Sequence, residues 1–199
     1  MRMFRHDMTA RLSCFCTIAM MLVMVSGCSS LKVMETWHKP AGQGQPYHKL
    51  MILGIGHDEN VRKMFENIVV DELSRGLVSA VASHTILPDL DKTNREGVIA
   101  AVKAAGCDAV LTTRAMSVGD SSVTQQGPNG TVGVVYGAAP VANRYNFLKA
   151  TLQSSLFDAG STELVWTATV KTVDADREAR VSRDMAKFFL EQLRRDGFL

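Results

Sequence analysis

The stretch Leu50-Met51-Ile52-Leu53-Gly54-Ile55-Gly56 decides the fold of this chain of 199 residues. A continuous apolar run of this length that ends in glycine is typical of a strand covered on both faces. Asp58, just behind it, has the side chain of a helix N-cap. Apolar residues then recur at helical spacing, at Val61, Met64, Phe65, Ile68, Val69 and Leu73. The sequence therefore predicts a strand and then a helix that ends near Gly76.

Strand and helix patterns continue to alternate up to residue 117. Val78 to Leu87 is rich in β-branched residues and stops at Pro88, which predicts a second strand. Thr93-Asn94-Arg95-Glu96 has the form of a capping box before a helix that closes at Gly106. Ala109 to Met116 is the third predicted strand. A β-α-β-α-β order over 48–117 is typical of a parallel sheet with right-handed crossovers.

The end of the chain predicts an antiparallel hairpin and one more helix. Phe147 to Phe157 alternates apolar and polar residues, a turn covers 158–162, and Leu164 to Lys171 alternates again. A helix follows from about Asp176 to Arg195. We therefore expect a single α/β (α+β) domain over 48–199, in which three helices pack on one mixed sheet.

A glycine-rich insertion at 118–143 interrupts this domain. Its tetrad Gly127-Pro128-Asn129-Gly130 is a strong turn signal, which suggests a hairpin between Ser121 and Tyr136. Long loops in compact domains are usually functional or disordered. We take Gly127, Pro128, Asn129, Gly130 and Tyr136 as a candidate interaction loop.

Residues 1–27 have the layout of an export signal. Arg2, Arg5 and Arg11 precede an apolar stretch from Cys14 to Val25. As a helix this stretch would cover only about 18 Å, short of the roughly 30 Å hydrocarbon core of a bilayer. The pattern favours a signal that is later removed over a permanent membrane span.

The stretch ends in Val25-Ser26-Gly27-Cys28, which resembles the lipobox of bacterial lipoproteins. The resemblance implies cleavage between Gly27 and Cys28 and attachment of fatty-acyl chains, such as palmitate, to Cys28. Two or more chains give stable membrane anchoring. Ser29, rather than aspartate, follows the cysteine, which implies the outer membrane facing the periplasm. The alternative is a buried cysteine after a turn of small residues.

Removal of the signal changes the composition of the chain. Three arginines and one aspartate leave with it, so 19 of the 22 basic and 19 of the 20 acidic residues remain. No long basic run is left, which argues against nucleic acid as a partner. Cys107 becomes the one cysteine besides Cys28, so no internal disulfide forms, and its apolar surroundings predict a buried thiol.

Residues 28–47 are predicted to be a lipidated cysteine and a flexible tether. The run from Lys39 to Pro46 is rich in glycine, glutamine and proline and has no apolar periodicity. Fully extended, the tether would reach about 60 Å. Trp37 interrupts it, and we expect this side chain to pack on the domain or at the membrane interface.

Motifs for catalysis or cofactors are missing from the sequence. Gly54-Ile55-Gly56 lacks the third glycine of a dinucleotide fingerprint, and Asp58 puts negative charge where a phosphate would bind. His38, His48, His57 and His84 do not have a recognised metal-ligand spacing. Hydrolase motifs are also missing. We therefore expect no enzyme, no cofactor and no metal.

Several segments together resemble a family of bacterial envelope lipoproteins without an assigned function. They are the lipobox, Trp37 and Pro40, the strand from Leu50 to Gly56, Val61-Arg62-Lys63-Met64-Phe65-Glu66, Leu156-Phe157-Asp158 and Leu164-Val165-Trp166. More distantly, the chain resembles the domains of LpoB-type activators of peptidoglycan synthases, the N-terminal domain of TolB and the periplasmic domain of CsgG. The resemblance implies a partner-binding fold without catalysis. The short tether departs from LpoB-type activators, whose tethers are long.

These observations lead to three functional hypotheses. The first is a membrane-anchored envelope module that binds a protein or a glycan, such as peptidoglycan, without catalysis. The second is a small-ligand-binding or enzymatic domain with a site at the carboxyl ends of the parallel strands, near Gly56, Leu87 and Ser117. The third is a homo-oligomer that pairs exposed strand edges.

Overall fold

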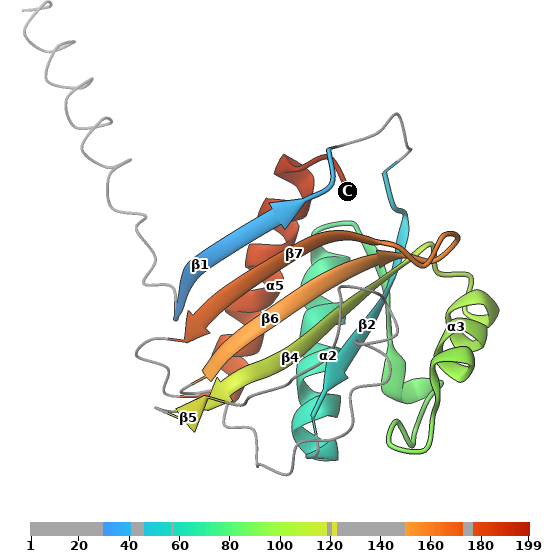
Figure 1. Ribbon diagram of the computed structural model, residues 1–199, viewed down its shortest axis with the longest axis horizontal. Coiled ribbons are helices and arrows are strands. Elements are labelled where there is room, and N and C mark those ends of the chain that lie inside the picture. The colour runs from blue at the N-terminus through green and yellow to red at the C-terminus, as the bar shows by residue number, and fades with distance from the viewer. Residues whose placement is uncertain (1–29, 41–45, 57, 119–120, 123–149, 173–176) are drawn as a thin grey trace, which may run out of the picture.

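The computed structural model describes residues 30–40, 46–56, 58–118, 121–122, 150–172 and 177–199. Its strands are β1 (Leu31–His38), β2 (Lys49–Ile55), β3 (Ser79–Ala82), β4 (Ala109–Val118), β5 (Ser121–Ser122), β6 (Ala150–Asp158) and β7 (Leu164–Thr172). Its helices are α2 (Glu59–Arg75), α3 (Arg95–Ala104) and α5 (Glu178–Arg195), with a short 3-10 helix, η2 (Ser83–Thr85). The strands form one sheet in the order β1-β7-β6-β4-β2-β3, and β5 pairs with β4 (Figure 1).

The predicted fold class is confirmed. Strand β2 pairs in parallel with both β3 and β4, while β4, β6, β7 and β1 pair antiparallel, so the sheet is mixed. The N-cap of α2 is Asp58, whose carboxylate accepts hydrogen bonds from the backbone N–H groups of Asn60 and Val61. The helix ends before Gly76, as the periodicity predicts.

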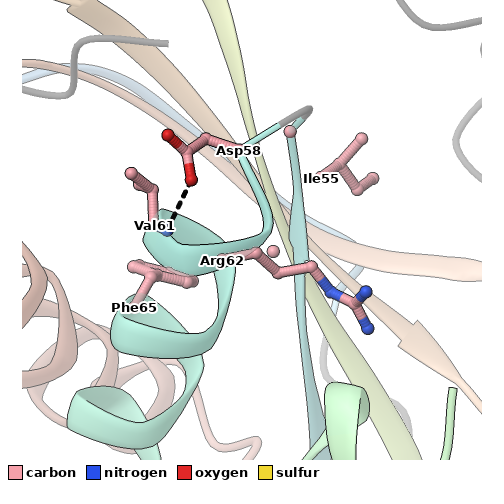
Figure 2. A pocket seen from close by; sticks show the side chains of 7 residues that line it. Ile55, Asp58, Val61, Arg62 and Phe65 are labelled. Carbon is pink, nitrogen blue, oxygen red and sulfur yellow. Dashed lines mark hydrogen bonds between the residues drawn. The ribbon is translucent and has the colours of Figure 1, made fainter. Parts of the chain in front are cut away.

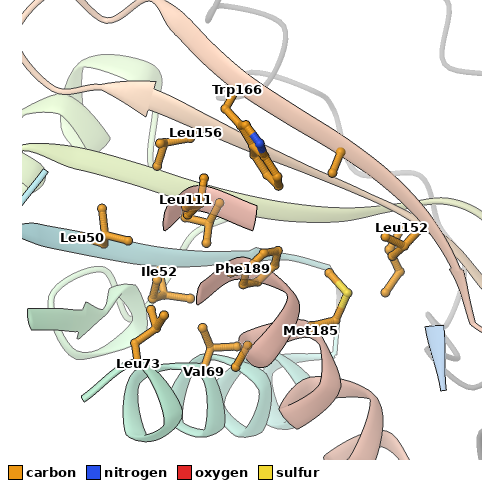
Figure 3. Packing of buried hydrophobic residues seen from close by; sticks show 14 of the residues in the cluster. Leu50, Ile52, Val69, Leu73, Leu111, Leu152, Leu156, Trp166, Met185 and Phe189 are labelled. Carbon is orange, nitrogen blue, oxygen red and sulfur yellow. The ribbon is translucent and has the colours of Figure 1, made fainter. Parts of the chain in front are cut away.

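Helices α2 and α5 lie side by side on one face of the sheet (Figure 1). Their apolar stripes meet the strands in the main core, which is drawn in Figure 3. Trp166, the largest fully buried side chain, belongs to this core, and its indole N–H donates a 2.9 Å hydrogen bond to Asp196 beyond the end of α5. Burial of side chains of this size stabilises the fold by about 1.5–3 kcal/mol each.

Helix α3 covers part of the opposite face. Val98, Ala101 and Val102 pack on Met51, Leu53 and Val110 and on the thiol of Cys107, which forms a second and smaller core. This second core lies at the β2 side of the sheet. The part of the face formed by β6, β7 and β1 lies outside it.

The tether prediction is wrong for residues 31–38, which form the edge strand β1. This strand pairs antiparallel with β7 from Leu31, opposite Thr172, to His38, opposite Trp166. Its register shifts between Val33 and Glu35, where Met34 is the extra residue of a bulge. The bulge breaks the two-residue alternation by which strands are recognised, and an edge strand needs only partial burial.

Ser30 fixes the start of β1 to the helix layer. Its side-chain hydroxyl and its backbone N–H both donate to Oδ2 of Asp184 on α5, at 2.6 and 2.9 Å. Ser30 is 3% exposed. Ser30, two residues after Cys28 in the sequence, is therefore part of the folded domain.

The second predicted strand, Val78 to Leu87, is only partly correct. The strand stops at Ala82, and Ser83–Thr85 turn into a 3-10 helix. Hydrogen bonds explain the turn: Thr85 Oγ1 donates to the carbonyl of Ala82, and the backbone N–H of His84 donates to Glu66. Side-chain bonds of this kind compete with the strand ladder.

The predicted capping box is also shifted by one residue. The N-cap of α3 is Asn94, not Thr93, and its side-chain oxygen accepts from the N–H of Gly97 at 2.9 Å. The helix ends at Ala104, and Gly106 adopts a φ of +62°, which suits glycine after a helix end.

Candidate functional site

The sheet presents a largely polar surface on the side away from α2 and α5. Alternation along β6 and β7 puts Gln153, Thr167, Thr169 and Lys171 on this side, because Leu152, Ala168 and Val170 belong to the main core. The pairing of β7 with β1 extends this surface onto β1, where Glu35 lies opposite Thr169 and Trp37 lies opposite Thr167. We call the surface formed by β6, β7 and β1 the open face.

A groove of about 320 Å³ runs across the open face. Its lining residues are Glu35, Trp37, Gln153, Leu164, Thr167, Ala168 and Thr169. The Trp37 side chain is 46% exposed, on a strand that is exposed along nearly all of its length. A volume of this size suits a small ligand or one to two rings of a longer chain.

Arg114 on β4 orients one polar wall of the groove. Its Nε and Nη2 donate to the side-chain amide oxygen Oε1 of Gln153, at 3.1 and 2.7 Å. The pair lies in direct register between β4 and β6. Because the carbonyl oxygen is taken, the amide NH₂ of Gln153 is the end that can serve a ligand as a donor.

The groove combines an exposed indole with a carboxylate, an amide and two hydroxyls. An indole offers a flat apolar surface at low entropic cost. Glu35 accepts hydrogen bonds, the Gln153 amide donates them, and Thr169 can do both. The Thr167 hydroxyl donates to the backbone carbonyl of Ser154 at 2.9 Å, so it is available to a ligand as an acceptor. This set matches a ligand with apolar ring faces and a rim of hydroxyl groups, which is the chemistry of a sugar.

At the carboxyl end of β2 the described residues line a very small cavity. It is lined by Gly54, Ile55 and Gly56 at the end of β2 and by Asp58, Val61, Arg62 and Phe65 at the start of α2 (Figure 2). Its volume of about 10 Å³ is roughly that of one water molecule. Gly54 allows close approach of the helix, since a Cβ there would lie 3.3 Å from the Phe65 ring. This cavity by itself is too small for a substrate.

Below this cavity lies a buried ion pair that sequence reasoning missed. Glu66 is fully buried and accepts hydrogen bonds from Gly54 N–H, Arg62 Nε, Ser83 Oγ and His84, at 2.6 to 3.1 Å. Arg62 also donates to the carbonyl of Leu87 at 2.7 Å and to Glu59 at 3.1 Å. The only signal in the sequence was the i, i+4 spacing of Arg62 and Glu66 beside the apolar stripe.

This network ties η2 and the following turn to α2. Each oxygen of Glu66 is occupied by donors, and the Arg62 guanidinium points away from the cavity drawn in Figure 2. A carboxylate saturated in this way has no lone pair directed at a substrate. The arrangement is therefore suited to fixing the backbone.

The remaining predicted site residues divide into two groups. Gly27 and Cys28, the predicted cleavage and lipidation site, lie outside the described residues. So does the candidate interaction loop of Gly127, Pro128, Asn129, Gly130 and Tyr136. Cys107, by contrast, is described and is a buried free thiol, as predicted. Burial raises the pKa of this thiol.

Two further findings apply to the described part of the chain. No group of three or more histidine, cysteine, aspartate or glutamate side chains is arranged there to hold a metal ion. None of the helices there combines the length and the apolar character needed to cross a membrane.

No protein-family model matches the chain, and no curated protein matches it significantly. Among solved structures, a PelC dodecamer from Paraburkholderia phytofirmans is 11% identical, with a TM-score of 0.43, and covers 80% of this chain and 95% of that one. A dodecamer of a single-residue PelC variant from the same organism is also 11% identical, with a TM-score of 0.41, and covers 80% of this chain and 94% of that one. Neither likeness identifies a family for this chain.

Proposed function

We propose that the protein is an envelope lipoprotein, anchored through Cys28, whose groove on the open face binds a glycan without catalysis. The lipobox supports the anchor, and Ser29 supports the periplasmic face of an outer membrane. The groove supports the ligand class. In this proposal the domain holds a strand of peptidoglycan or another envelope polysaccharide close to its membrane.

The observation that carries the proposal is the position of Trp37. Trp37 is 46% exposed and lies in register with Thr167, while Glu35 lies in register with Thr169. A sugar ring stacked on the indole would place its hydroxyls beside both threonines, the Glu35 carboxylate and the Gln153 amide.

The two tryptophans of the chain make this testable by fluorescence. Trp166 is fully buried and bonded to Asp196, so a ligand that stacks on Trp37 changes the emission of Trp37 alone. We expect soluble muropeptides, or oligosaccharides of another envelope glycan, to shift and saturate this emission. Replacement Trp37→Ala should weaken binding at least tenfold, and Trp37→Phe should restore part of it.

Met34→Ala is the matched control. Met34 lies on the same strand and is 56% exposed, but it does not line the groove. The Met34→Ala variant should bind glycan as tightly as the parent protein. If no glycan of the envelope changes the emission, or if Trp37→Ala binds as well as Met34→Ala, the groove is not a glycan site.

The competing hypothesis is that the protein binds a protein partner through the candidate interaction loop. Envelope crosslinking separates the two, because replacing residues 125–145 with a short linker leaves every groove residue in place. Partners that persist after this replacement but are lost with Trp37→Ala support the groove. The reverse pattern supports the loop.

A further inference from the structure

We propose that the start of β1 and the end of β7 rest on the phospholipid surface to which Cys28 is anchored, with Lys32 and Lys171 binding anionic headgroups. The inference rests on the lipid anchor of the proposed function and adds an orientation of the domain and a second contact with the membrane. We call Lys32, Val33, Met34 and Lys171 the docking patch.

Chain length brings the docking patch to the membrane. Ser30 is fixed to Asp184 by two hydrogen bonds, so only Ser29 separates a fixed residue from Cys28. Two residues span at most about 7 Å. An acylated Cys28 therefore holds Ser30, and with it the beginning of β1, beside the headgroup layer.

Charge complementarity favours anionic lipid as the occupant. Lys32 and Lys171 are direct register partners on neighbouring strands, and both are exposed. Like charges placed opposite one another repel at a separation of about 5 Å between Cβ atoms. Among the described residues neither lysine forms an ion pair, and Glu35, the next acidic residue on the strand, pairs in register with Thr169. A phosphate between the two ammonium groups would remove this repulsion.

Apolar side chains accompany the two lysines. Val33 is 47% and Met34 56% exposed. Val33 lies opposite the core residue Val170, so its side chain is on the helix side of the edge strand, and Met34 is the residue at the bulge. Exposed apolar side chains beside basic ones are typical of surfaces that lie in a membrane interface. The end of the sheet next to the anchor, where Lys32 and Lys171 lie, is therefore the part that meets anionic lipid.

Because the sheet meets the lipid at its end and not with its open face, the glycan groove stays open. Trp37 is five residues beyond Lys32, or about 17 Å along the strand. The groove then faces the aqueous space above the headgroups, within reach of a polymer that runs along the membrane.

The test uses the mature lipidated protein in vesicles of phosphatidylcholine alone or with one third phosphatidylglycerol. An environment-sensitive fluorophore is attached at Met34→Cys in a Cys107→Ala background, and in a second sample at Lys103→Cys on α3. Spin labels on the lipid headgroups should quench the Met34 probe at least twofold more than the Lys103 probe when phosphatidylglycerol is present. With the probe at position 34, replacing both Lys32 and Lys171 by serine should remove the extra quenching that phosphatidylglycerol causes. Replacing Lys103 and Lys187 by serine, with the probe at the same position, should leave it unchanged.

Equal quenching of the two probes, or indifference to both lysine replacements, would overturn the proposal. A Met34 probe that responds to protein density but not to phosphatidylglycerol would identify a second copy of the chain as the occupant, and would overturn it too. A separate detergent phase separation tests the anchor, because a protein without lipid on Cys28 would partition into the aqueous phase. Failure of glycan binding leaves the quenching unchanged.

Discussion

Ser30 and Asp184 are joined by a 2.6 Å hydrogen bond between residues 154 positions apart. The backbone N–H of Ser30 donates to the same carboxylate oxygen at 2.9 Å. This contact holds the first described residue of the chain against α5. It makes β1 an integral strand of the sheet, although the sequence of the segment suggests a linker.

Asp184→Ala should loosen β1. The substitution leaves both donors of Ser30 unpaired in a site that is 3% exposed, which costs about 1–3 kcal/mol of unfolding free energy. Urea unfolding measures the cost, and hydrogen exchange should show faster exchange of β1 amides than of β6 amides. Glu191→Ala, on an exposed position of the same helix, is the control and should change neither.

Arg62 and Glu66 should be strongly coupled. Removing one partner leaves a buried charge uncompensated, which typically costs 3–5 kcal/mol. We expect the double variant Arg62→Met/Glu66→Leu to be more stable than either single variant, because it leaves no buried charge. A double-mutant cycle of urea midpoints tests this. Additive effects of the two substitutions would contradict it.

Asp158 should make stability depend on acid pH. Burial favours its neutral form, but hydrogen bonds from Ser161 and from the Tyr47 hydroxyl outweigh this and hold the pKa of Asp158 below its ordinary value. A lowered folded-state pKa gives stability that is present above the unfolded value, about 3.9, and is lost as the pH falls through the folded value.

Asp158→Asn should therefore lower the unfolding free energy by about 1 kcal/mol at pH 7, where three donors lose a charged acceptor. The difference from the parent protein should shrink below about pH 4. Thermal or urea unfolding across this range provides the measurement. Asp71→Asn, at an exposed position on α2, is the control and should leave the unfolding free energy unchanged both at pH 7 and below about pH 4.

Cys107 should be almost inert in the folded protein. Burial raises the pKa of its thiol, and the thiol packs inside the second core. We expect a thiol reagent at neutral pH to react on the order of 100-fold more slowly with the native protein than in urea. Rapid labelling of the native mature protein would show that the second core opens readily.

The parallel core could be predicted from the sequence because its signals are local. The apolar run from Leu50 and the helical spacing behind Asp58 each report their own element. Strand β1 could not be predicted, because the bulge at Met34 breaks the alternation and its partner strand β7 lies far along the chain.

The groove was beyond sequence reasoning for a related reason. Glu35 and Trp37, Gln153, and Thr167 and Thr169 come from three strands, and only the register of the pairing brings them together. The buried network has the same origin, because Ser83 and His84 reach Glu66 only when the second predicted strand turns early.

The contact between Ser30 and Asp184 also has a consequence for the order of maturation. A peptidase that cuts before Cys28 needs the flanking backbone in an accessible form, whereas the folded domain withdraws Ser30 from solvent. The partners of this segment, β7 and α5, are the last elements in the order of the chain. In the lipoprotein proposed above, late arrival of these partners would leave the cleavage site free while the rest of the chain crosses the membrane. The N-terminal end would then close onto the domain after the lipid is in place.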